Sequence, residues 1–186
     1  LKTANLIQAR LLPKQATATF GEIDVSGIVL TSNECGGDWW HYFSKGPNLY
    51  VAIADVTGSG TSAALITAAA RAVFSRLENE DLSLIEMMRA WDHAIASCSQ
   101  NEVFMTGLLL RLNTQTGEGA FVNAAHNPPY VMRENTDGSF SPEFLLSGVS
   151  SRLGEGSTGR FSEKQFQLGP NEAVILYTDG LFSIER

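Results

Sequence analysis

The stretch NLYVAIADVTGSGTSAALITAAARAVFSRL, residues 48–77, contains the clearest structural signal of this sequence. Residues 48–54 are nearly all apolar, which predicts a strand that is buried on both faces. Asp55 follows directly, a glycine turn comes next, and residues 63–77 have helical periodicity. Thr61 or Ser62 can cap this helix. The stretch therefore predicts a core strand, a turn that carries one carboxylate, and a covering helix.

The rest of the chain extends this pattern in both directions. Residues 22–31 are rich in β-branched side chains and predict another strand. Residues 83–97 predict a second helix, in which Ser83 and Glu86 have the spacing of a capping box. Short apolar runs separated by turn signals follow, and the last predicted strand covers 173–178. This order predicts an α+β fold of two stacked, mostly antiparallel sheets flanked by helices.

Composition limits the kinds of function. The chain has 186 residues, of which 44% are hydrophobic, and this length suits one domain with a sizeable core. A net charge of -7 without Lys/Arg runs argues against nucleic acid and against an anionic membrane surface, and it is compatible with metal cations. Cys35 and Cys98 form neither a disulfide framework nor a zinc motif, so we expect reduced thiols and a cytoplasmic location. No apolar run reaches the roughly 18 residues of a membrane span.

The first residues differ from the rest. Residues 1–13 have roughly helical apolar spacing and end at Pro13, which predicts an N-terminal helix that continues from an upstream region. Two interpretations stay open: a helix that transmits a signal or forms a homodimer, and a simple packing helix. Residues 14–186 would form the main domain.

Three carboxylates lie where predicted strands give way to glycine turns. Asp38 follows Gly36-Gly37, Asp55 ends the strand 48–54, and Asp179 ends the strand 173–178 ahead of Gly180. Carboxylates and backbone carbonyls are the ligands that hard divalent cations prefer, and glycine lets the backbone approach closely. Asp beside Gly is also common turn chemistry, so both interpretations remain open on pattern alone. A phosphate-binding loop at 55–64 is disfavoured because it has neither GxxxxGK[ST] nor GxGxxG.

Five blocks carry a family resemblance. In chain order they are LLP (11–13), ECGGDWW (34–40), ADVTGSGTSAALITA (54–68), FMTGLLLRLNTQTGEGAFVNAAHNPPYVM (104–132) and LGPNEAVILYTDGL (168–181). Together they resemble the metal-dependent protein serine/threonine phosphatases, in particular the bacterial branch of the stage II sporulation phosphatase and the sigma-factor-regulating phosphatases. The resemblance implies an α/β/β/α sandwich and hydrolysis of phosphoserine or phosphothreonine. It also implies two Mn²⁺ or Mg²⁺ ions, a metal-bridging water as the attacking group, and a small phosphorylated anti-sigma-factor antagonist as substrate.

The resemblance also implies roles for individual residues. Asp55 would bridge the two metals, Asp38 would bind one of them, and the carbonyl of Val56 would be a backbone ligand. Asp179 would bind the other metal. Asp38 and Asp55 are thus the residues expected to carry catalysis, with no side-chain nucleophile.

The chain departs from the family pattern at several places. Ser59 stands where the family usually has His, and His41 stands at a position that is often acidic. Ala125-His126 replaces Gly-His in the AGHNPP block. A late Asp-Asp-apolar-Thr motif that supplies another metal ligand is not found before Arg186, so we expect a C-terminally incomplete domain and a weak Asp179 metal site.

Two hypotheses of different kinds follow. The first is a phosphatase domain, the output end of a longer bacterial signalling protein. The second is a degenerate phosphatase fold that binds a regulatory partner without turnover. A nucleotide-binding domain is a third, disfavoured hypothesis.

Other conspicuous residues have structural interpretations. We expect His126 to order a turn, His93 to be structural or exposed, and one of Trp39 and Trp40 to face inward. A redox role for Cys35 is disfavoured, because no basic neighbour is visible in the sequence. We expect a helical stripe to be core: Met87, Met88 and Trp91.

Overall fold

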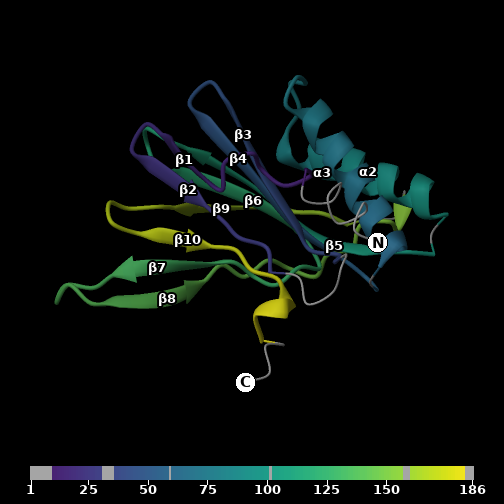
Figure 1. The fold of residues 1–186 in the computed structure, drawn as a ribbon. Helices are drawn as coiled ribbons and strands as arrows, with labels where there is room; N and C mark the ends of the chain where they lie inside the picture. The colour runs from purple at the N-terminus through teal and green to yellow at the C-terminus, as the bar shows by residue number, and fades with distance from the viewer. Residues whose placement is uncertain (1–9, 31–35, 59, 101, 157–159, 183–186) are drawn as a thin grey trace.

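The computed structural model describes residues 10–30, 36–58, 60–100, 102–156 and 160–182, drawn in Figure 1. The described strands are β1 (Thr17–Phe20), β2 (Ile23–Ser26), β3 (Trp39–Lys45), β4 (Asn48–Val56), β5 (Met105–Asn113), β6 (Glu118–Ala124), β7 (Tyr130–Glu134), β8 (Phe140–Phe144), β9 (Glu163–Gln167) and β10 (Ala173–Ile175). The described helices are α2 (Thr61–Leu77), α3 (Leu84–Ser99) and the short 3-10 helix η2 (Asp179–Phe182).

A five-stranded antiparallel sheet forms the centre of the fold, in the order β3-β4-β5-β6-β9. Strand β4 lies inside this sheet and pairs with β5 along its whole length and with β3 over 48–54. Its residues are buried or half-buried on both faces, as the apolar run at 48–54 predicts. The register places Trp39 opposite Ala54 and Thr106 opposite Asp55, so the ends of three strands meet around Asp55.

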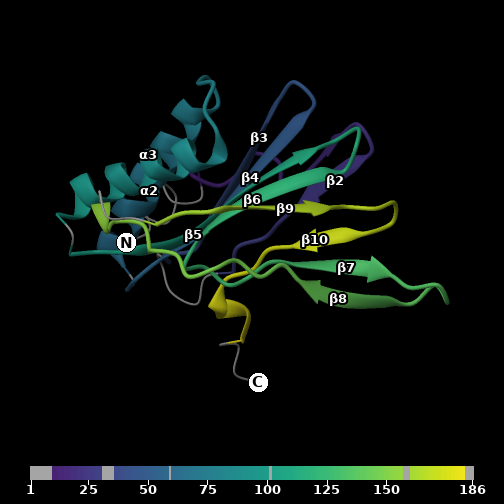
Figure 2. The ribbon, with the colours of Figure 1, turned by 180° about the vertical axis from the view of Figure 1, so that it is seen from behind.

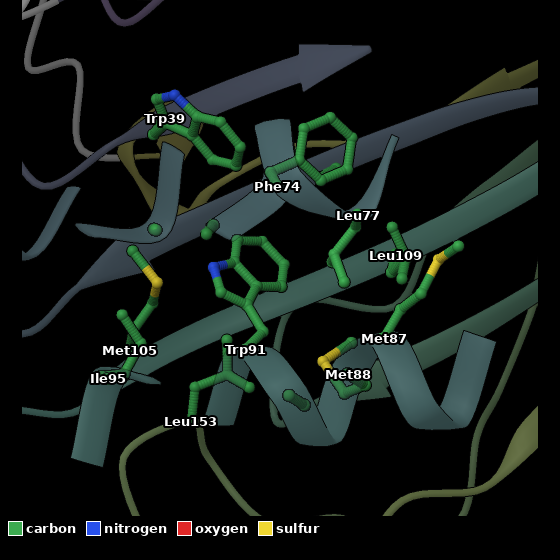
Figure 3. Close-up of a cluster of buried hydrophobic side chains, with 14 of the residues drawn as sticks. Trp39, Phe74, Leu77, Met87, Met88, Trp91, Ile95, Met105, Leu109 and Leu153 are labelled. Atoms are coloured by element: carbon green, nitrogen blue, oxygen red, sulfur yellow. The ribbon is translucent and has the colours of Figure 1, made fainter. Parts of the chain in front are cut away.

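Helices α2 and α3 cover one face of this sheet (Figures 1 and 2). The cluster between them is shown in Figure 3, where Trp91 of α3 lies among Trp39, Phe74 and Met105. Met87, Met88 and Trp91 are fully buried, so the predicted core stripe of α3 is confirmed.

The two helix starts differ. The capping box of α3 is confirmed, because the Glu86 N–H donates to Ser83 Oγ and the Ser83 N–H donates to Glu86 Oε2. The predicted cap of α2 is wrong: the N-cap is Gly60, without a side-chain cap hydrogen bond. Thr61 and Ser62 already lie inside the helix, since glycine takes up the left-handed φ of 82° that the turn requires.

A three-stranded sheet, β10-β7-β8, packs on the opposite face of the large sheet. The apolar cluster between the sheets includes Leu108 and Phe121 of the large sheet and Val131 of β7. The predicted α+β class with antiparallel sheets is confirmed. A four-layer sandwich is not what the described residues show, because their two long helices, α2 and α3, both pack against the same face.

Two of the predicted strands are longer than the observed ones. The strand predicted at 22–31 ends at Ser26, because Ser26 pairs with Thr17, the first residue of its partner strand β1. The strand predicted at 173–178 ends at Ile175 and is at most half-buried, because among the described strands β10 lies at the edge of the small sheet, next to β7. The helix predicted at 1–13 lies mostly outside the described residues, and Arg10–Leu12 form a turn or bend.

The tryptophan pair is buried more completely than predicted. Trp39 is 1% exposed on the helix side of the sheet, and Trp40 is 7% exposed and packs against Gly27. Both therefore contribute to the core, on opposite faces of β3.

No helix in the described ranges is both long and apolar enough to cross a membrane. Cys98 is a free, exposed thiol, and Cys35 lies outside the described residues.

Candidate functional site

Asp55 is the penultimate residue of β4 and lies directly beside Gly37. The Val56 N–H donates to the Gly37 carbonyl over 3.3 Å, so the Gly36-Gly37 turn is attached to the end of β4. A Cβ on Gly37 would lie 2.9 Å from Asp55 Oδ1 and 2.6 Å from the Val56 carbonyl oxygen. Only glycine leaves room there, and the two oxygens therefore border the same small space.

Asp38 contacts a segment that is distant in sequence. Its side chain forms a hydrogen bond with Thr178, and a Cβ on Gly180 would lie 3.5 Å from Asp38 Oδ2. The segment after β10 thus lies against the loop before β3. The structure brings the three predicted carboxylates to one end of the large sheet, although they come from three separate parts of the chain.

The carboxylates repel one another. Burial is the main cause that raises the pKa of Asp38, and the charge of Asp179 adds to it, while the Thr178 hydrogen bond opposes it. Burial, followed by the charges of Asp38 and Asp179, raises the pKa of Asp55 to about 6. A divalent cation would relieve both the repulsion and the desolvation of these groups.

The donor set suits a hard cation, but its members do not converge on one point. Within the described ranges, no group of three or more His, Cys, Asp or Glu side chains is close enough to hold a metal ion. Asp179 is exposed and is the first residue of η2, not the last residue of a buried strand as predicted. Asp38, Asp55 and the Val56 carbonyl fit the chemistry of an oxygen-ligand site, with Asp179 within electrostatic range.

The turn after Asp55 is anchored to β5 by a threonine. The Thr57 N–H donates to the Phe104 carbonyl over 2.9 Å. The Thr57 hydroxyl donates to the same carbonyl over 3.0 Å and accepts the Phe104 N–H over 3.3 Å. This fixes the direction in which the chain leaves β4.

Thr106, opposite Asp55, hydrogen-bonds the ring of His126 over 2.9 Å. His126 is 7% exposed, and burial lowers its pKa to about 4, so the ring is neutral at pH 7. The expected turn exists, but the Asn123 side chain orders it by bonding the His126 N–H and carbonyl. Sequence reasoning missed Thr106 and Thr178. Thr178 adjoins Asp179, a signal that could have found it, whereas Thr106 is identified only by strand register.

The remaining candidates lie elsewhere. His41 faces the helix layer, where it packs against Phe74, and burial together with Arg71 lowers its pKa to about 4. His93 is exposed on α3. Ser59 and Cys35 lie outside the described residues.

The family described as stage II sporulation protein E (SpoIIE) matches residues 45–185, which is most of the chain. The chain belongs to the SpoIIE family. This confirms the resemblance to the bacterial sigma-factor-regulating branch of the metal-dependent phosphatases.

Two relatives from Bacillus subtilis are similar over most of this SpoIIE-family chain. Phosphoserine phosphatase RsbP is 26% identical over 165 residues, which cover 86% of the chain and 40% of RsbP. Phosphoserine phosphatase RsbU is 22% identical and covers 86% of the chain and 46% of RsbU. The chain therefore spans less than half the length of these relatives.

Solved structures share the fold of the SpoIIE-family chain. The SiaA-PP2C domain of Pseudomonas aeruginosa has a TM-score of 0.74 at 24% identity, covering 96% of this chain and 70% of that one. RsbX in complex with magnesium has a TM-score of 0.60 at 19% identity, covering 78% and 67%. The catalytic domain of the phosphatase PstP, in complex with two manganese ions, has a TM-score of 0.52 at 16% identity, covering 82% and 74%.

Proposed function

We propose that this chain is a protein serine/threonine phosphatase domain that requires two Mn²⁺ or Mg²⁺ ions. The observation that carries the proposal is the proximity of Asp38 and Asp55 at the Gly37 turn, with the charge of Asp179 acting on both carboxylates. Membership of the SpoIIE family and similarity to two phosphoserine phosphatases support the same activity.

Asp55 would contribute to both metal sites, because the charges of Asp38 and of Asp179 both act on its carboxylate. Asp38 and the Val56 carbonyl would bind one ion, and Asp179 would bind the other. When bound, divalent ions at such a site supply a Lewis acid and lower the pKa of water, so that hydroxide is available near neutral pH. Thr178 orients the Asp38 carboxylate through its hydrogen bond, and Gly37 keeps the space between the ligands open.

We propose unequal affinity for the two ions. Asp55 is half-buried and its carboxylate is held on a rigid strand, whereas Asp179 is exposed at the start of η2. A site with fewer fixed ligands binds its ion more weakly, so the Asp179 ion would be lost first.

We also propose that helices complete the sandwich on the outer face of the small sheet. Phe140 and Phe144 of β8 are 47% and 52% exposed, and register places Pro142 between them on the same face. Apolar side chains on an exposed sheet face favour a covering layer. In this proposal the domain of residues 14–186 is joined to further segments in a longer protein.

For the substrate we propose a small cytoplasmic regulatory protein phosphorylated on serine or threonine, of the kind that antagonises an anti-sigma factor. Membership of the SpoIIE family supports this class of substrate protein. The net charge of -7 makes bound cations necessary for attracting a phosphorylated surface.

One observation favours a second candidate function, a binding module without turnover. Within the described ranges, no three ligand side chains converge as a formed metal site would require. Such a module would bind a phosphorylated partner and leave its phosphate in place.

Phosphate release from a phosphoserine peptide, measured with and without Mn²⁺, separates the two. The phosphatase proposal predicts Mn²⁺-dependent release that Asp55→Asn abolishes and that Asp81→Asn, at a fully exposed position, leaves intact. Binding of the peptide without release in any variant would replace the phosphatase by the binding module.

A further inference from the structure

His126 lies where the chain passes from the large sheet to the small one. Strand β6 ends at Ala124 and belongs to the five-stranded sheet, and β7 begins at Tyr130 in the three-stranded sheet. The ring is 7% exposed, and the proposed phosphatase chemistry does not use it.

The backbone of His126, from which the ring projects, is held by the side chain of Asn123. Asn123 Oδ1 accepts the His126 N–H over 2.7 Å, and Asn123 Nδ2 donates to the His126 carbonyl over 3.0 Å. Asn123 itself is 2% exposed and lies in β6. The imidazole therefore projects from a rigid point of the large sheet.

One side of the ring faces β5, the strand that pairs with the Asp55 strand β4. Nδ1 and Thr106 Oγ1 are 2.9 Å apart, and Thr106 is the register partner of Asp55. Because burial keeps the ring neutral, one nitrogen accepts and the other donates. If the threonine hydroxyl donates to Nδ1, the proton of the imidazole is on Nε2.

The other side of the ring faces the segment after β10. The Tyr177 backbone and the charge of Asp179 both act on the imidazole. Nε2 is buried without a hydrogen bond of standard geometry to the described residues, and a hydrogen-bonding interaction with the Tyr177 backbone raises the pKa of the ring against the larger effect of burial. Tyr177 directly precedes Thr178, whose side chain bonds Asp38.

We propose that His126 is a positioning residue that holds the segment Tyr177–Asp179 against β5, and so fixes Asp179 relative to Asp55. Asp55 lies in β4 of the large sheet and Asp179 begins η2 after the small sheet, and His126 contacts the register partner of the first and interacts with the backbone near the second. Its relevance to metal binding rests on the phosphatase function proposed above, whereas the contact itself does not.

The test compares His126→Asn with His93→Asn, because His93 is exposed on α3 and controls for the substitution itself. The Asn amide reaches Thr106 in place of Nδ1, but it is too short to reach Tyr177 in place of Nε2. Two quantities are measured: amide hydrogen exchange in the metal-free chain, and Mn²⁺ affinity by calorimetry.

His126→Asn should speed exchange at residues 177–180 at least about tenfold relative to β4 amides, and weaken Mn²⁺ binding about 10- to 100-fold, as loss of a supporting contact does. His93→Asn should change neither. His126→Gln, whose longer amide reaches Tyr177, should restore slow exchange, and it is also the variant to use if His126→Asn does not fold.

Equal acceleration at 177–180 and in β4 for His126→Asn, or fast exchange at 177–180 in His126→Gln, would overturn the proposal. A wild-type chain that shows neither Mn²⁺ binding nor phosphate release would refute the phosphatase function instead. The exchange result in the metal-free chain decides the role of His126 in either case.

Discussion

Asp55 lies so close to Gly37 that residue 37 has no room for a side chain: a Cβ on Gly37 would lie 2.9 Å from Asp55 Oδ1. The same Cβ would lie 2.6 Å from the Val56 carbonyl oxygen. The two oxygens proposed as metal ligands thus border a space that stays free because residue 37 is glycine.

Gly37→Ala should therefore damage both stability and metal binding. We expect a loss of about 1–3 kcal/mol in the free energy of unfolding, the usual cost of inserting a methyl group into filled space. Urea denaturation and Mn²⁺ calorimetry measure the two effects. Gly148→Ala is the matched control, since nothing lies within 4 Å of its Cβ position. Equal behaviour of the two variants would show that the close approach at Gly37 is unimportant.

The raised pKa of Asp55 predicts a pH dependence of stability. Because its pKa is about 6 in the folded chain against 3.8 for the ordinary group, the folded state holds this proton to higher pH than the unfolded state. The stabilisation is therefore present below about pH 4 and is lost as pH rises to about 6. Because solvent screens this half-exposed carboxylate, the effect should be on the order of 1 kcal/mol.

Asp55→Asn should remove this loss, so the metal-free variant should be more stable than the wild type at pH 7. Urea unfolding at pH 4, 5, 6 and 7 measures the difference, with Asp81→Asn as the control for loss of an exposed charge. A variant that is less stable than the wild type at pH 7 would refute the prediction. Saturating Mn²⁺ should reverse the order of stability, because only the wild type keeps its ligand.

Asp92 of α3 ties the helix layer to the loop at 153–156. Its Oδ1 accepts the Gly154 N–H over 2.8 Å and the Gly156 N–H over 3.3 Å, and the side chain is buried. Leu153 in turn exchanges two backbone hydrogen bonds with Met105, next to the Asp55 strand end.

Asp92→Ala should cost about 2–3 kcal/mol, because it leaves buried N–H donors without an acceptor. Asp92→Asn keeps an acceptor oxygen of the same size and should cost clearly less. Thermal and urea unfolding of both variants provides the comparison. If the Asn variant is as unstable as the Ala variant, hydrogen bonding to this loop is not what Asp92 contributes.

Ala125 has a left-handed backbone, with φ of 53°, at an exposed position between β6 and β7. Ala125→Gly should stabilise the chain by about 0.5–1 kcal/mol, since glycine adopts this conformation without the clash of a Cβ. Asn171→Gly, at φ 61°, should gain less, because asparagine tolerates the same region. A destabilised Ala125→Gly variant in urea unfolding would contradict the prediction.

The sequence patterns predicted those parts of the fold that depend on local periodicity. The apolar run 48–54 and the helical spacing of 63–77 predicted β4 and α2, and Ser83 with Glu86 predicted the start of α3. These elements are determined by residues close together in the chain, so a local pattern suffices. A local pattern also explains the wrong prediction at 173–178. The composition of this run is that of a buried strand, but its place at the edge of the small sheet depends on residues elsewhere in the chain.

The candidate site was predictable only in part. Asp38 and Asp55 follow from glycine turns beside core strands, and they do lie together. Thr106, Thr178 and His126 join segments far apart in the chain, and only strand register and the stacking of two sheets bring them to the carboxylates. Sequence spacing contains no information about such contacts.

The most direct test is calorimetric titration of the metal-free chain with Mn²⁺ at pH 7, for the wild type, Asp55→Asn and Asp81→Asn. The proposed site requires binding to the wild type and to Asp81→Asn, and an affinity at least about tenfold lower for Asp55→Asn. Equal Mn²⁺ affinity in all three proteins would show that the carboxylates beside Gly37 do not hold the metal.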